Sequence, residues 1–540
     1  MNPRALVLVV LALTACGAPR AAPVVAAPVA AEPAAKTPDP TPTLELRLRP
    51  DGASSQVFVT VTAEGTPAEL ARWAGAIPPQ LSARDRQGSV ALRRDQVGLG
   101  FERPVHAPLT LEYAVRSGPF GQVTPGGSAL DPNHFRGAGE DLLLLPVAFE
   151  DRPVPVRLSI DAKSFGPDAG GASSLGSDSE ESLSISGRAL RRSSFIAGPL
   201  GRARFDAPEG IDRAAWLGFT SFDPRQVAAE VAGFRTGARQ YFAARSAPPL
   251  TLLLVSDARR PGRFDVARRT ASILIQVGVA QPWDAPLRLA VYQRVLQEWL
   301  GSELAVAPQN PGDVVEPAWF TEGMSRHLAR DLAFRFGLLS AEEVAAEVNH
   351  LIGLYVTSPY QNVPLGELVE QPDRAAALTQ AVVRGALYSL SLGDIDDLLR
   401  KLFREARSTN APVSMDALGG DPTPLRSGAR IQLSPDALGP CFIPRRQSVT
   451  PFVLGFVEQG HTVKSPSGPA RAAGLVDGDE FSDLRYQSND PSVKVRLKVK
   501  RGDAWQELSF LPAGKPVFAQ GFAKKPGVKD DDCRRGPAKE

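Results

Sequence analysis

Apolar and polar side chains alternate with a two-residue period in four segments between residues 44 and 162. The segments are LELRLRP, QVFVTVTAEG, LTLEYAVRSG and VPVRLSIDA. This period is typical of antiparallel strands that bury one face. Turn-forming clusters, such as PDG at 50–52 and PGG at 125–127, separate the segments. The pattern predicts an N-terminal β-sandwich over residues 44–162.

A helical period dominates from residue 191 on. Two strand-like segments, 192–205 and 250–260, flank an amphipathic helix at 221–245 that begins at Asp223 and Pro224. A helix pair follows at 287–304 and 317–337, because apolar residues recur at helical spacing in the first and Gly337 ends the second. Further helices are predicted at 341–356 and, as one continuous piece, at 384–406. Residues 191–407 are thus predicted to form a mostly helical domain with a short sheet.

Four stretches show neither period. Residues 17–43 are almost entirely Ala, Pro and small polar residues, which predicts an extended tether. The Gly/Ser-rich residues 163–190 and the Pro/Gly-rich residues 408–444 are interpreted as linkers or loops, and residues 526–540 as a polar tail. A last domain remains at 445–525.

Residues 1–16 have the features of a bacterial lipoprotein signal peptide. Arg4 precedes the apolar run ALVLVVLAL, and the lipobox LTAC ends at Cys16. The run is shorter than the roughly 20 residues that a membrane span needs. We expect lipidation of Cys16 to anchor the mature chain to a membrane in an oxidising compartment. Gly17 follows it, as in known lipoproteins of the outer membrane, so the expected location is the bacterial cell envelope, facing the periplasm.

Composition narrows the function further. The formal net charge of +2 argues neither for a nucleic-acid surface nor for a polyacidic substrate, so no nucleic-acid partner is expected, and 22% charged residues is ordinary for a soluble globular protein. Only five histidines occur in 540 residues, which restricts any zinc site, since imidazole is its usual ligand. Cys441 and Cys533 bracket the last domain; they could form a disulfide or remain two separate buried thiols.

The helix pair carries a family resemblance. The second helix opens with WFTEG, and the first contains Trp299. Together they resemble the catalytic core of gluzincin-type zinc peptidases, in particular the glycyl aminopeptidase family. That resemblance implies an α+β multidomain protein: an N-terminal β-sandwich, a thermolysin- or gluzincin-like, mostly helical middle domain and a C-terminal PDZ domain. In the family, H-E-x-x-H precedes the Trp and supplies two zinc ligands and the general base.

The catalytic positions of that motif have changed. Anchored on Trp299, the motif falls on Gln293, Arg294, Val295, Leu296 and Gln297. Glu322 alone matches a family zinc ligand, and Val382 stands where the family's Tyr donates a hydrogen bond to the intermediate. Amides are poor zinc ligands beside imidazole, and a guanidinium repels a dication. These positions are expected to be vestigial, with no catalytic residue, no metal and no cofactor.

The last domain resembles a PDZ module. SPSGPARAAGLVDGD at 465–479 matches the family's signature, and the loop of Val453, Leu454, Gly455 and Phe456 fits the one whose N–H groups hold a peptide's terminal carboxylate. The stretch FSDLRYQSNDPS is too short and turn-rich for the family's second helix. The resemblance therefore implies a PDZ fold whose peptide groove lacks a wall.

Three functions follow from these observations. The main hypothesis is an inactive, membrane-anchored relative of the zinc aminopeptidases that binds a peptide or partner protein. The second is an active metallopeptidase with an altered site that uses zinc, and the third is a purely structural envelope lipoprotein. The main hypothesis also predicts that Arg294 or the two glutamines now pair with Glu322, because these side chains lie on neighbouring positions of two packed helices.

Overall fold

The computed structural model describes residues 41–96, 98–120, 127–207, 210–244, 248–257, 264–308, 313–486 and 490–534. Cys16 and most of the predicted tether lie outside these residues. None of the helices within them combines the length and apolar composition needed to cross a membrane.

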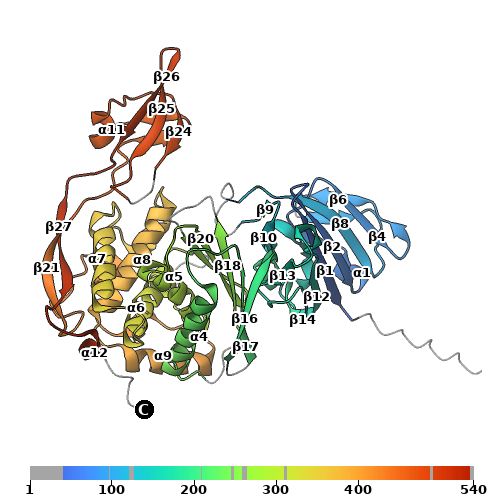
Figure 1. The fold of residues 1–540 in the computed structure, drawn as a ribbon, viewed down its shortest axis with the longest axis horizontal. Coiled ribbons are helices and arrows are strands. Elements are labelled where there is room, and N and C mark those ends of the chain that lie inside the picture. The colour runs from blue at the N-terminus through green and yellow to red at the C-terminus, as the bar shows by residue number, and fades with distance from the viewer. Residues whose placement is uncertain are drawn as a thin grey trace, which may run out of the picture. The chain divides into compact units, whose positions relative to one another are not determined.

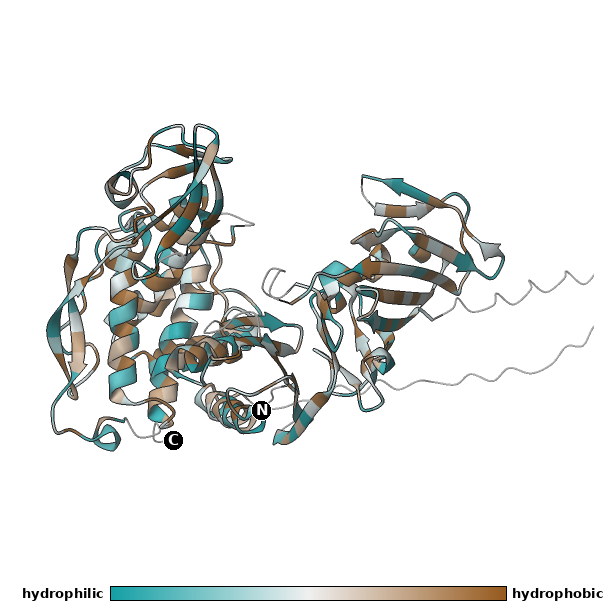
Figure 2. Cartoon of the chain, turned by 45° about the horizontal axis from the view of Figure 1, so that its top comes forward, coloured by the Kyte–Doolittle hydropathy of each residue, from teal (hydrophilic) through white to brown (hydrophobic). Residues whose placement is uncertain are grey.

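The amino-terminal part is β-rich, as the two-residue period predicts. Its largest sheet has the strand order β14-β12-β1-β2-β8-β4-β5. The bounds are β1 Thr43–Asp51, β2 Gln56–Glu64, β4 Leu81–Asp85, β5 Gly88–Ser89, β8 Leu109–Arg116, β12 Val154–Ile160 and β14 Glu180–Ile185. Buried residues alternate with partly buried or exposed ones along β1 and β2, and the strands of this part carry both hydrophobic and hydrophilic residues (Figure 2). One pair departs from the antiparallel expectation: β1 and β12 are parallel, because a long connection rather than a hairpin joins them.

Two four-stranded sheets complete this part. One has the order β11-β3-β7-β6 and the other β13-β15-β10-β9. Their bounds are β3 Trp73–Gly75, β6 Leu92–Asp95, β7 Gly98–Phe101, β9 Ala129–Asp131, β10 His134–Ala138, β11 Leu144–Pro146, β13 Gly170–Ser173 and β15 Ser194–Gly198. Strands of all three sheets contribute to one core, in which Leu46, Val59, Trp73 and Phe195 are buried.

The prediction of a linker at residues 163–190 was wrong. This stretch contains β13 and β14, and β14 pairs with β12 from Ile185↔Val154 to Glu180↔Ser159. Strand β14 lies at the edge of its sheet, so polar side chains such as Glu180 are tolerated there. Those polar residues hid the strand in the sequence.

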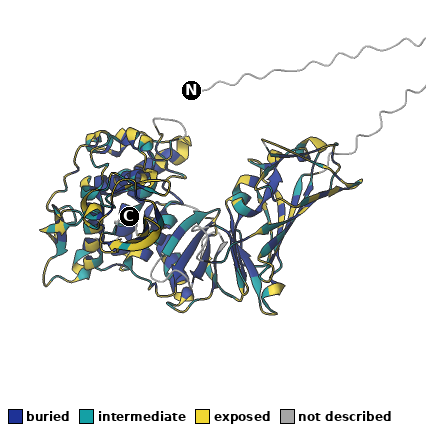
Figure 3. Ribbon diagram, turned by 90° about the horizontal axis from the view of Figure 1, so that it is seen from above, coloured by how far each residue is buried: buried dark blue, intermediate teal, exposed yellow. Residues whose placement is uncertain are grey.

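A five-stranded sheet, β16-β17-β18-β20-β19, lies beside the helices of the middle part (Figure 1). The bounds are β16 Leu200–Ala207, β17 Gly210–Leu217, β18 Thr251–Asp257, β19 Phe264–Arg269 and β20 Ser272–Gly278. Every residue of β18 and β20 is buried, as Figure 3 shows for much of this sheet in dark blue. Two cores explain this burial: Leu252 and Leu254 belong to the helical core, while Leu253 and Val255 belong to a core shared with Phe120 and Ile196.

The helices of the middle part pack into one large core. They are α4 Pro224–Tyr241, α5 Ala285–Leu296, the π-helix η3 Trp319–Met324, α6 Ser325–Arg335, α7 Ala341–Thr357, α8 Arg374–Ser391 and α9 Asp396–Thr409. Two expected lengths were wrong. Helix α5 ends at Leu296 instead of 304; a turn follows at residues 297–299, and Gly301 beyond it has φ +93°. The piece expected at 384–406 is two helices, interrupted at Gly393 with φ +74°.

Shorter helices fill the connections. They are α1 Pro67–Leu70, α2 Gly139–Leu142, η1 Val147–Phe149, η2 Lys163–Phe165, α3 Gly187–Arg191, η4 Leu365–Glu370, η5 Met415–Leu418 and α10 Thr423–Ser427. Helices η5 and α10 correct the linker expected at 408–444. Met415, Leu418 and Leu425 are buried in the helical core, so the Pro and Gly residues of this stretch serve as turns between packed segments.

A two-stranded ribbon changes the boundary expected at residue 445. Strand β21, Phe442–Val449, pairs with β27, Val517–Lys524, and β27 packs on α7 (Figure 1). Phe442 and Phe522 belong to the helical core, so both ends of the predicted last domain return to the middle part. Beyond β27, α12 spans Asp530–Cys533.

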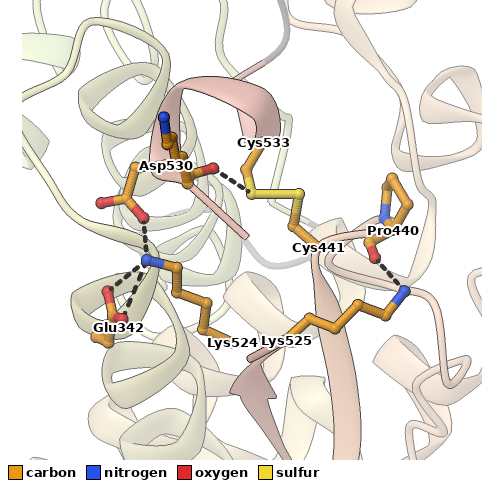
Figure 4. Close-up of a disulfide and its surroundings, with 8 residues drawn as sticks. Glu342, Pro440, Cys441, Lys524, Lys525, Asp530 and Cys533 are labelled. Carbon is orange, nitrogen blue, oxygen red and sulfur yellow. Dashed lines mark hydrogen bonds and ion pairs between the residues drawn. A yellow bond between two sulfur atoms is a disulfide. The ribbon is translucent and has the colours of Figure 1, made fainter. Parts of the chain in front are cut away.

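The described residues of the predicted polar tail, 526–534, are attached to the rest of the chain. A disulfide joins Cys441 to Cys533, with Cα atoms 5.6 Å apart (Figure 4). Lys524 lies 2.7 Å from the Asp530 carboxylate and 3.1 Å from that of Glu342 on α7. The end of the chain is therefore held to the ribbon and to α7.

The stretch of chain that connects β21 to β27 forms a small β unit with its own core. It contains β22 Val457–Gln459, β23 Thr462–Lys464, α11 Gly468–Ala472, β24 Phe481–Arg485, β25 Val495–Arg501 and β26 Ala504–Phe510. Phe456, Val463, Leu475 and Leu497 are buried at the centre of the unit. The described residues between Asp479 and Val493 contain no second helix. Its likeness to a PDZ module stays a prediction.

Candidate functional site

The end of α5 supplies three of the side chains that the sequence singled out. Asp284 caps this helix by accepting a hydrogen bond from the Leu287 N–H at 3.1 Å. Gln293 and Arg294 lie in the last turn, and Gln297 is the C-terminal cap. The i, i+4 spacing keeps the two glutamines on one face.

The fourth side chain, Glu322, comes from the π-helix η3 at the start of α6. Such one-turn π segments are often found at functional sites. Helix α8 crosses it at very short range: a Cβ on Gly385 would lie 2.0 Å from the Trp319 carbonyl oxygen, and a Cβ on Gly323 would lie 2.4 Å from that of Val382. The two glycines therefore allow the backbone approach that fixes Glu322 opposite α5.

The four side chains form one hydrogen-bonded group. Arg294 Nη1 lies 2.6 Å from both Glu322 carboxylate oxygens, and Gln293 Nε2 donates to Glu322 Oε2 at 2.7 Å. Gln297 Oε1 accepts from Arg294 Nη1 at 3.1 Å, while its Nε2 donates to the Thr321 carbonyl at 3.2 Å. The pairing expected between Glu322 and the α5 side chains is thus present.

Strand β19 forms two hydrogen bonds with Arg294. Arg294 Nε donates to the Val266 carbonyl oxygen at 3.2 Å, and Arg268 Nη1 donates to the Arg294 carbonyl at 3.0 Å. Burial lowers the pKa of Arg268, and the neighbouring Arg294 charge adds to that effect. Arg294 and Glu322 are each 27% exposed, so the ion pair stays within reach of solvent.

These residues do not fit a zinc ion. A zinc site needs three protein ligands of imidazole, thiolate or carboxylate type around one point. Here one carboxylate faces two neutral amides, and a cation already lies 2.6 Å from its oxygens. Among the described residues, no group of three or more His, Cys, Asp or Glu side chains is arranged to hold a metal ion.

Val382 and the nearby Arg384 both contact the backbone of other segments. Val382 carries no hydroxyl and contributes its backbone to the contact with Gly323. Two residues on, buried Arg384 donates to the carbonyl oxygens of Tyr360 and Gln361 at 3.2 and 3.0 Å. Burial lowers the pKa of Arg384. A buried histidine of α6, His327, lies with its Nδ1 2.8 Å from Arg330 Nη2.

Sequence reasoning missed a second ion pair near the same helix end. Glu298 accepts from Arg235 of α4 at 2.6 and 2.8 Å, and Asp212 of β17 accepts from the same guanidinium at 2.8 Å. Burial would lower the pKa of Arg235, but the two carboxylates raise it above its ordinary value. A signal did exist: Arg235 falls on the apolar face of its helix, at core spacing from Val231 and Ala238.

The loop predicted to hold a peptide carboxylate is partly engaged within the small β unit. The Val453 N–H donates to the Pro512 carbonyl at 2.7 Å, and the Gly455 carbonyl accepts from the Ser467 N–H at 2.6 Å. Phe456 is buried in the unit's core, and Leu454 packs against it. Gly455 has φ +83°, a conformation that glycine adopts readily.

Comparison with solved structures identifies the fold. The chain superposes on an aminopeptidase N family protein from Idiomarina loihiensis with a TM-score of 0.65, over 89% of this chain and 98% of that one, at 15% identity. The fold resembles that of the aminopeptidase N family. No family profile and no curated protein sequence matches the chain.

Two further structures match less closely. An M1 zinc metallopeptidase from Deinococcus radiodurans gives a TM-score of 0.44 at 18% identity, over 71% of this chain and 90% of that one. Yeast LTA4 hydrolase in complex with bestatin gives 0.44 at 13% identity, over 74% and 69%. At these identities the likeness concerns the fold alone, and function has to be argued from the site.

Proposed function

We propose that this protein is a catalytically inactive relative of a zinc aminopeptidase that acts as a peptide- or protein-binding lipoprotein of the bacterial cell envelope. The Arg294–Glu322 ion pair carries the proposal. On a peptidase-like scaffold, the one carboxylate that could bind a metal is taken by a guanidinium at 2.6 Å. No residue of the group can act as general base, since both glutamines are neutral and Glu322 is paired.

Metal content tests the inactivity. The purified protein is loaded with zinc and dialysed, and bound zinc is measured together with hydrolysis of aminoacyl arylamides. We expect less than one-tenth of an equivalent of zinc and no hydrolysis that a chelator removes. Stoichiometric zinc with chelator-sensitive hydrolysis, lost in Glu322→Ala, would instead establish the active metallopeptidase.

Membrane attachment is tested separately. Lipidation at Cys16 predicts that the protein sediments with membranes of the expressing bacterium and incorporates labelled palmitate. Cys16→Ser should release it to the soluble fraction, whereas Cys441→Ser should leave its attachment unchanged. A membrane-bound Cys16→Ser variant would contradict the anchor without affecting the argument about zinc.

A further inference from the structure

A groove follows one face of α7 and the first turns of α8, and its lining includes none of the four side chains of the Arg294–Glu322 group. Its lining includes Asn349, Gly353 and Thr357 of α7, Thr379 and Gln380 of α8, and Val449 of β21. Gly353 allows the strand to come close, because a Cβ there would lie 3.3 Å from Val449 Cγ1. Residues of the small β unit, among them Leu454 and Tyr486, also line the groove, so it lies between the helical part, the ribbon and that unit.

Gln380 is the unusual residue in this lining. Its side chain is only 1% exposed, yet neither Oε1 nor Nε2 has a hydrogen-bond partner among the described residues. Leaving both ends of a buried amide unpaired costs free energy, and native proteins rarely do so without a reason. An apolar side chain of the same size would avoid that cost.

The same groove shows what a primary amide can do at this place. Asn349 Oδ1 accepts from the Phe522 N–H at 2.7 Å, and Asn349 Nδ2 donates to the Phe522 carbonyl at 2.8 Å. One amide thus satisfies both backbone groups of a residue in the extended strand β27. This contact acts like a strand neighbour and needs no particular side chain on the strand.

We propose that the groove binds an extended peptide segment, and that Gln380 pairs with the N–H and C=O of one ligand residue as Asn349 does with Phe522. Gln380 is a lining residue whose amide atoms are shielded in the unliganded protein, and rotation about its side-chain bonds would bring the amide to the ligand. The recognition is of backbone and not of sequence. This inference rests on the proposed function, since it gives the peptide ligand its site.

Binding tests the groove with two matched variants. The probe is a pool of labelled random decapeptides, added to the full-length protein in detergent. Gln380→Met conserves volume and removes the amide, so we expect at least tenfold weaker binding with no fall in Tm. Asn349→Leu, which removes an amide that already has partners, should lower Tm clearly. A photo-crosslinker at Thr379 should capture the peptides, while one at the exposed Ser408 of α9 should not.

The outcomes separate the two proposals. Peptide binding that Gln380→Met leaves unchanged, without crosslinking at residue 379, would overturn the groove and leave the binding function standing. A Tm loss in Gln380→Met as large as that in Asn349→Leu would show that a buried water already satisfies the amide, and would also overturn the groove. Absence of any peptide binding by the unmodified protein would overturn both.

Discussion

Two arginine–carboxylate pairs lie near the end of α5, and they are built differently. Arg235 and Glu298 are 3% and 9% exposed, and Asp212 adds a second carboxylate to the same guanidinium. Arg294 and Glu322 are each 27% exposed and lie where the resemblance places a metal site. A buried pair cannot lose one partner cheaply, whereas a solvent-reachable pair can. We therefore expect the first pair to stabilise the fold and the second pair to determine what the site can bind.

The largest expected effect comes from replacing the three α5 side chains that surround Glu322. The combined variant Gln293→His, Arg294→Glu and Gln297→His places two imidazoles one turn apart opposite Glu322. If the scaffold has kept its geometry, we expect zinc content after dialysis to rise to one ion per chain. Arg294→Glu alone, which adds no imidazole, is the control and should retain none. A zinc-free triple variant would mean that the geometry needed for the metal has been lost as well.

Breaking the buried pair should cost most in stability. Arg235→Met leaves Glu298 and Asp212 without their cation, which we expect to lower the free energy of unfolding by about 3–5 kcal/mol. Urea unfolding followed by circular dichroism measures it. Arg225→Met, at an exposed position of the same helix, should change it by less than about 0.5 kcal/mol. Equal costs for the two variants would remove the distinction between scaffold and site.

A substitution in the closely packed backbone around the site should lower the free energy of unfolding more than a substitution in the ion pair itself. Gly385→Ala would put a Cβ 2.0 Å from the Trp319 carbonyl, so α8 and η3 must separate. We expect a loss of about 1–3 kcal/mol in the free energy of unfolding, as for overpacked cores. Gly366→Ala is the matched control, because its Cβ would meet nothing within 4 Å. A neutral Gly385→Ala would contradict the close crossing.

The smallest effect is expected from the site pair itself. Arg294→Met exposes Glu322 to water instead of leaving it buried, so the free energy of unfolding should change by no more than about 1 kcal/mol. The same urea experiment measures it. A loss as large as that of Arg235→Met would show that Arg294 is part of the scaffold, and the comparison of the two pairs would fail.

Much of the site could be predicted from the sequence, but its surroundings could not. The spacing of Gln293, Arg294 and Gln297 and the WFTEG segment were enough to predict the pairing with Glu322. The contact of Arg235 with Glu298 was missed, because it joins α4 to the turn after α5, and no local pattern specifies how these two segments pack. The close crossing of α8 over η3 could not be predicted from the sequence either. Whether a glycine allows two backbones to approach depends on which segment packs against it in the fold.

The sequence by itself determined the β-rich start, the helical middle and the loss of imidazoles from the site, because period and residue type are local properties. Only the tertiary structure decided which distant segments meet. It pairs the polar strand β14 with β12, returns β27 to α7 and joins Cys441 to Cys533 across 92 residues. Such contacts depend on the packing of the whole chain, where burial and pairing with distant partners outweigh local preference.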